Sequence, residues 1–101
     1  MSKPQRITED QLDLMHIIEC DSNASQRQIA RKTGLSIGKV NYCLKGLVDI
    51  GFIKIENFTK STQKINYTYV LTRKGLLEKA IITKKFILKK KQEFDKLNSY
   101  I

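Results

Sequence analysis

The chain has 101 residues, 41% of them hydrophobic, with a single proline, which suits one domain with one modest core and excludes a disordered chain. Nineteen Lys and Arg against ten Asp and Glu give a net charge of +9, which is typical of proteins that bind nucleic acid. Because no run of about eighteen apolar residues occurs and the opening MSKPQRITEDQ holds no apolar signal segment, we expect a cytoplasmic protein with no membrane partner.

Capping signals predict where four helices begin. The sequences TEDQ at 8–11 and SQRQ at 25–28 both fit the capping box, in which a hydroxyl and a glutamine satisfy free N–H groups reciprocally. Ser36 and Thr72 fit the simpler hydroxyl cap. An apolar residue before each cap and another four positions into the helix support all four starts. The predicted helices cover residues 9–20, 26–33, 37–50 and 73–98.

The first three helices are predicted to form a helix-turn-helix core. The first should bury Leu12, Met15 and Ile18. Only residues 34–36, beginning with Gly34, separate the second helix from the third, and this turn length is typical of a helix-turn-helix.

The third predicted helix has two distinct faces. At about 100° per residue, one third of its circumference forms an apolar stripe of Ile37, Val40, Cys43, Leu44 and Leu47. The other side carries the residues predicted to contact bases, which are Gly38, Lys39, Asn41, Tyr42 and Lys45. Lys suits guanine and Asn suits adenine in the major groove. A solvated helix face of no special role is the alternative, since most surface stripes are polar.

Two alternating segments, 52–56 and 67–71, predict a β-hairpin joined by a long basic loop at 57–66. A helix-turn-helix followed by such a wing is a winged helix, so the fold is predicted to be mainly α with a small β-hairpin. Residues 7–72 would form this domain. Phosphate contacts are predicted at the helix starts and in the wing, from Ser25, Gln26, Arg27, Ser36, Lys60 and Lys64.

The last predicted helix, 73–98, would be about 39 Å long, which is more than a small domain can cover. Its apolar stripe predicts dimerisation with a second copy through Leu77, Ile81, Ile87, Leu88, Phe94 and Leu97. Lys84 and Lys91 interrupt the stripe. The lysines in 84–91 either keep the helix in solvent or contact phosphates or acidic partners.

The sequence offers no catalytic set and no metal site. Cys20, Cys43 and His16 are too few for a four-ligand zinc site, and neither a Ser/His/Asp set nor a Gly-rich phosphate loop is present. We therefore expect no enzyme, no metal and no cofactor. Cys43 is expected to be a buried thiol, with a redox switch as the alternative. A winged-helix module that binds protein without specific DNA binding is the alternative function.

The stretch SQRQIARKTGLSIGKVNYCLKGLVDIGFIKI, at 25–55, and NYTYVLTRKG, at 66–75, resemble MarR-type winged-helix transcriptional regulators. Residues 36–48 and 67–75 look closest to the short exopolysaccharide-associated subgroup, in which the run Gly-Lys-Val-Asn-Tyr-Cys-Leu is typical. The resemblance implies a homodimer that binds double-stranded DNA and controls transcription, including that of exopolysaccharide genes. Typical MarR proteins are longer, with helices on both sides of the core, and the single flanking helix here makes a small-molecule effector doubtful.

Overall fold

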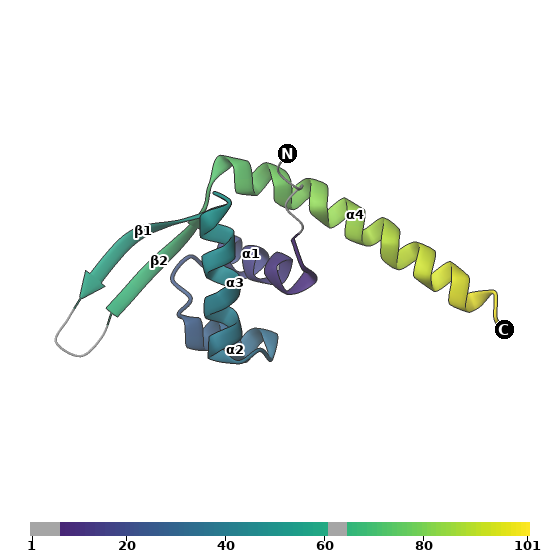
Figure 1. Ribbon diagram of the computed structural model, residues 1–101, viewed down its shortest axis with the longest axis horizontal. Helices are drawn as coiled ribbons and strands as arrows, with labels where there is room; N and C mark the ends of the chain where they lie inside the picture. Colours follow the sequence, from purple (N-terminus) through teal and green to yellow (C-terminus); the bar gives the residue numbers. More distant parts are fainter. Residues whose placement is uncertain (1–6, 61–64) are drawn as a thin grey trace.

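The computed structural model describes the backbone of residues 7–60 and 65–101 and the side chains of residues 7–56 and 67–101. In this part of the chain, helices surround a small core beside a two-stranded antiparallel sheet, and the last helix extends away from the body (Figure 1). The elements are α1 (Glu9–Cys20), α2 (Gln26–Thr33), α3 (Ile37–Asp49), β1 (Ile53–Lys60), β2 (Ile65–Leu71) and α4 (Arg73–Asn98). The predicted fold class, mainly α with a β-hairpin and a long C-terminal helix, is confirmed.

The helix starts are built as the capping signals predict. Thr8 Oγ1 accepts a hydrogen bond from the Gln11 N–H at 3.1 Å, and Ser25 Oγ accepts one from the Gln28 N–H at 3.1 Å, while both glutamine side chains accept from the cap N–H. Each such cap is worth about 1 kcal/mol. Gly34 ends α2 with φ 76°, in the left-handed region that favours glycine. The third helix ends at Asp49, one residue before the predicted end.

The hairpin is longer than predicted. The sequence pattern places residues 57–60 and 65–66 in the loop, but they pair across the strands, as Asn57 with Thr68 and Lys60 with Ile65. In β2 the alternation of polar and apolar residues in fact extends back to Ile65, a signal that the prediction did not use, whereas in β1 it is interrupted after Ile55. The register shifts between Ile55 and Asn57, so Glu56 is the extra residue of a β-bulge.

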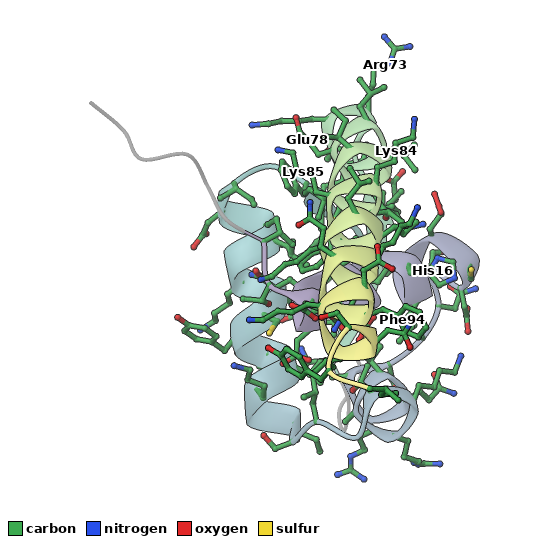
Figure 2. All side chains as sticks on the ribbon, turned by 90° about the vertical axis from the view of Figure 1, so that its right-hand side faces the viewer. His16, Arg73, Glu78, Lys84, Lys85 and Phe94 are labelled. Atoms are coloured by element: carbon green, nitrogen blue, oxygen red, sulfur yellow. The ribbon has the colours of Figure 1, made fainter. Side chains whose placement is uncertain are left out.

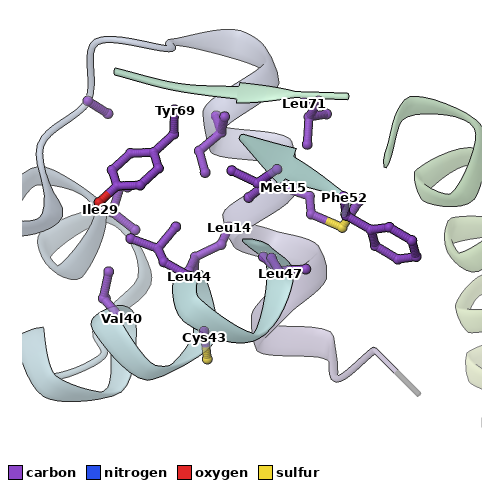
Figure 3. Close-up of a cluster of buried hydrophobic side chains, with 13 residues drawn as sticks. Leu14, Met15, Ile29, Val40, Cys43, Leu44, Leu47, Phe52, Tyr69 and Leu71 are labelled. Carbon is purple, nitrogen blue, oxygen red and sulfur yellow. The ribbon is translucent and has the colours of Figure 1, made fainter. Parts of the chain in front are cut away.

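The core lies between α1, α2, α3 and the base of the hairpin (Figure 3). Leu14, Met15, Ile29, Val40, Leu47 and Ile53 are its largest fully buried side chains. Leu14 is missing from the predicted set, whereas Leu12 is only half-buried. The buried arc of α1 is displaced because this helix packs against α3, α4 and β2 as well as α2. The expected burial of Ile37 is also wrong, because this side chain is 48% exposed.

The base of α4 is fixed on the turn between α3 and β1. Thr72 Oγ1 donates a hydrogen bond to the Gly51 carbonyl at 2.6 Å, and the Thr72 N–H donates to the Phe52 carbonyl at 3.0 Å. Gly75 lies so close to this turn that an added Cβ would be 2.1 Å from the Phe52 carbonyl oxygen. Backbone therefore packs directly on backbone at this point.

Two ion pairs continue the contact between α4 and α1. Lys79 Nζ lies 2.8 Å from Glu19 Oε1, and Lys90 Nζ lies 3.1 Å from Glu9 Oε1. The order of the partners shows that the two helices run antiparallel, as Figure 1 also shows. Glu9 raises the pKa of Lys90 through this hydrogen bond. Among the described residues, no helix is long and apolar enough to cross a membrane.

We predict that Gly75→Ala destabilises the protein by about 1 to 3 kcal/mol, because the new methyl group would overlap the Phe52 carbonyl. The matched control is Gly38→Ala in α3. An added Cβ there meets only Ser36 Oγ at 4.0 Å, so this variant should be more stable by roughly 0.5 to 1 kcal/mol. Urea unfolding followed by circular dichroism measures both changes, and equal stability of the two variants would contradict the close packing.

Candidate nucleic-acid interface

The outward face of α3 presents polar and cationic groups to solvent. Lys39, Tyr42 and Lys45 are exposed, and the Tyr42 side chain is 73% accessible. Asn41 is half-buried on the flank of this face. Lys39 Nζ lies 5.9 Å from the centroid of the Tyr42 ring, within the range of a cation–π interaction. Amino, amide and phenol groups on this face are donors suited to base edges and phosphates.

The opposite face of α3 determines how these groups are presented. Val40, Cys43, Leu44 and Leu47 are buried in the core. A helix anchored by four side chains over about two turns cannot rotate about its axis without exposing them. Their burial therefore directs Lys39, Tyr42 and Lys45 outward.

Most of the residues predicted to contact phosphates at the helix starts already make hydrogen bonds within the protein. Ser25 Oγ and Ser36 Oγ accept the capping hydrogen bonds of α2 and α3. Gln26 Nε2 donates to the Tyr69 hydroxyl at 3.2 Å, so this side chain ties α2 to β2. Arg27 is exposed. Of this group, Arg27 has the side chain best placed for a phosphate.

The site near the turn between α2 and α3 includes two residues that were not predicted, Arg31 and Ile37. Arg31 stands one helical turn after Arg27, and both arginines line a shallow hollow together with Ala30, Gly34, Leu35 and Ile37. The spacing of the arginines at i and i+4 is a signal that the sequence contains. The sequence contains no such signal for the exposure of Ile37, because its position on the helical wheel belongs to the apolar stripe that is expected to be buried.

A second hollow lies between α3 and the hairpin. Asn41 and Lys45 face it from α3, and Ile55, Tyr67 and Tyr69 face it from the strands. The structure thus brings two of the predicted base-contacting residues to the edge of the wing. Lys60 belongs to β1, but its side chain and the whole of Lys64 lie outside the described residues, so the wing contacts stay a prediction.

The residues predicted for dimerisation occupy α4, away from the α3 face. All six are exposed, and Leu77, Ile87 and Phe94 are each more than 60% accessible. Figure 2 views α4 from its C-terminal end, with Phe94 near the viewer and with Lys84 and Lys85 on different sides of the helix. The body instead contacts Ile82, which the prediction did not include.

Cysteine and histidine form no metal-binding group in the described part of the chain, where no cluster of three or more His, Cys, Asp or Glu side chains occurs. Cys20 is exposed, with its Sγ 3.7 Å from His16 Nε2. Cys43 is buried, and desolvation raises the pKa of its thiol against an opposing contribution from Lys39.

Comparison with known proteins supports the winged-helix assignment. Residues 11–54 match a family described as winged helix-turn-helix DNA-binding. No curated protein matches in sequence. Solved structures do match in fold. They include MepR, a transcription regulator of the Staphylococcus aureus multidrug efflux pump MepA, which has a TM-score of 0.64 and 17% identity over 89% of this chain and 65% of its own.

FabT of Streptococcus pneumoniae, solved in complex with DNA, has a TM-score of 0.62 and 19% identity over 93% of this chain and 64% of its own. A MarR family regulator from Neisseria meningitidis has a TM-score of 0.62 and 17% identity over 87% of this chain and 61% of its own. The chain thus spans less than two thirds of each of these proteins. At such identities the matches establish the fold, which is that of a winged helix-turn-helix domain with a long C-terminal helix.

We predict that the two thiols react at very different rates in the folded protein. Burial raises the pKa of Cys43, so less of its thiolate is present at a given pH than for an ordinary thiol, and access is also blocked. With an aromatic disulfide reagent at mildly alkaline pH, the Cys20 thiol should react quickly and the Cys43 thiol only as the protein opens.

Cys20→Ser should remove the fast reaction and Cys43→Ser the slow one. Denaturant should make the two thiols of the native sequence react alike. Fast reaction of the Cys20→Ser variant without denaturant would contradict the burial of Cys43.

Proposed function

We propose that the protein is a sequence-specific transcriptional regulator that binds double-stranded DNA in the cytoplasm, with α3 in the major groove and the wing at 57–66 on the adjacent backbone. It acts by binding, and no catalytic step is proposed. One observation carries this proposal: Lys39, Tyr42 and Lys45 project from a helix whose other side is locked in the core. The dimensions of a major groove admit one α-helix.

The distribution of charge supports the same orientation on DNA. Residues 1–22 hold two basic and five acidic side chains, and α1 is the acidic helix of the chain. Two of its carboxylates, Glu9 and Glu19, are paired with lysines of α4. The helices α2 and α3 carry arginines and lysines, with Asp49 as the only acidic residue of 23–50. A polyanion is therefore attracted to α2 and α3 rather than to α1.

We also propose a homodimer formed through α4. Its exposed apolar side chains recur along 26 residues, on a helix whose contacts with the body include Ile82 and the ion pairs of Lys79 and Lys90. A second copy of the same stripe is a self-complementary cover for them. Such a dimer would present two copies of α3 to half-sites of a pseudo-palindrome, separated by about 34 Å or a multiple of it.

The regulated genes are proposed from resemblance alone. The residues at 36–48 and 67–75 are similar to those of the exopolysaccharide-associated MarR subgroup. On that basis we propose exopolysaccharide genes as targets.

We predict that Asn41→Ala and Lys45→Ala each weaken binding to a selected duplex by about 1 to 3 kcal/mol and binding to random DNA much less. Arg27→Ala, Lys60→Ala and Lys64→Ala should weaken binding to both duplexes alike. Removal of one ionic interaction with a phosphate should reduce the slope of log affinity against log salt by about 0.9. Fluorescence anisotropy at several salt concentrations measures these changes, on a duplex chosen by selection from a random pool.

The matched control is Lys85→Ala, which removes an exposed cation of α4 away from the α3 face. Its effect should be small, because salt screens charges beyond about 8 to 10 Å. A different result would favour the protein-interaction module. In that case selection finds no preferred duplex, and the Asn41→Ala and Lys45→Ala variants bind DNA as strongly as the native protein.

The dimer is tested by placing a charge on α4. Leu88→Glu should convert the dimer into a monomer, because it places a carboxylate among apolar side chains at the seam. Lys89→Glu introduces the same residue at the next position, about 100° around the helix, and should leave the dimer intact. Light scattering gives the mass of both variants, and a monomeric native protein would refute the proposed dimer.

A further inference from the structure

Ile37 is an apolar side chain that is partly exposed at the start of α3. It is the first residue of α3 and is 48% exposed. Its surroundings are the hollow that Arg27 and Arg31 also line. Its side chain has no hydrogen-bonding group, so it cannot bind a phosphate as the neighbouring arginines can. Among the aliphatic residues of α3 larger than glycine, it is the one whose side chain is exposed.

The position of Ile37 on the helix is informative. Asn41 and Lys45 follow it at i+4 and i+8, so the three side chains form a column, with each step about 6 Å along the axis and about 40° around it. Asn41 and Lys45 face the hollow beside the hairpin. Ile37 continues the same column toward the turn between α2 and α3. In a helix-turn-helix, the N-terminal residues of the second helix are the ones that contact base edges.

Chemistry restricts what an aliphatic side chain can contact there. The C5-methyl group of thymine is the apolar group that the base pairs present in the major groove. A step of about 6 Å along α3 corresponds to slightly less than two base pairs at about 3.4 Å each. We propose that Ile37 is a specificity-determining residue that packs on a thymine methyl group, within about two base pairs of the base contacted by Asn41. This inference rests on the proposed reading of DNA by α3.

The neighbours of Ile37 are suited to hold it at that depth. Arg27 and Arg31 lie on the same hollow and can each pair with a phosphate of the strand that borders the groove. Two such interactions fix the height of the start of α3 above the bases. The specific contact is then apolar and the anchoring contacts are ionic, so salt and methyl removal affect different parts of the binding energy.

The test removes single methyl groups from the DNA. In the selected duplex, each thymine is replaced in turn by deoxyuridine, which keeps the hydrogen-bonding groups of the base and loses only the methyl. For the native protein, the replacement at one position should weaken binding about 4-fold, which corresponds to about 0.8 kcal/mol for one buried carbon group. The Ile37→Ala variant should bind the thymine and deoxyuridine duplexes equally at that position and keep its response at all others.

Tyr42→Ala serves as the control, since an exposed ring on the same helix is the competing partner for a thymine methyl. This variant should keep the full deoxyuridine penalty at the Ile37 position. The fold of both variants is checked by thermal unfolding, which should match that of the native protein because both side chains are exposed.

Three outcomes are distinguished. Loss of one deoxyuridine penalty in Ile37→Ala alone supports the contact. A selective native protein whose penalties are all retained in Ile37→Ala, or are lost in Tyr42→Ala instead, overturns the role of Ile37 and leaves the proposed function standing. A native protein that selects no duplex overturns the proposed function, and the inference fails with it.

Discussion

The burial of one side of α3 is the constraint on which the rest of the structure depends. Val40, Cys43, Leu44 and Leu47 are each at most 2% exposed, and they fix the rotation of this helix against α1 and the hairpin. At about 25 cal/mol per Å² of apolar surface, rotating such a stripe into water costs several kcal/mol. The outward residues need no specific contacts of their own to be held in place, so they remain available to a ligand.

Among the described residues, acidic and basic side chains are also separated, so that the outward face of α3 is not surrounded by carboxylates. The acidic helix α1 lies beside the basic helix α4, and the ion pairs of Glu9 and Glu19 lie near the two ends of α1. The Lys90–Glu9 pair is exposed, and such pairs contribute little to stability, whereas the Lys79 side chain of the other pair is partly buried. Their importance lies in placement, because they neutralise acidic groups while leaving the cations of α2 and α3 outside all of the described ion pairs.

Local signals account for what the sequence predicts well. Caps such as Thr8 and Ser25 act within four residues, so the helix starts follow from short patterns. The errors arise where distant segments decide. Leu14 is buried because α1 has neighbours on several sides. Ile37 is exposed because it lies at the hollow beside α2 and not in the core. The bulge at Glu56 depends on pairing across the hairpin, which the alternation within one strand does not reveal, whereas the extension of β2 to Ile65 follows from its own alternation. The outward face of α3 can be predicted from the helical spacing of its apolar residues. The hollow beside α2 cannot, because it depends on the angle between α2 and α3.

The junction at Thr72 has a mechanical consequence. One residue separates β2 from α4, its hydroxyl and N–H are bound to the turn at Gly51 and Phe52, and Gly75 leaves no space for sliding. Helix α4 therefore leaves the wing in a direction that these contacts restrict. Its 26 residues make it about 39 Å long, so pivoting by about 5° at the base corresponds to about 3 Å at the tip. A molecule that displaces the far end of α4 must therefore also break the contacts of Lys79 and Lys90 with α1 before it changes the angle between α4 and the wing.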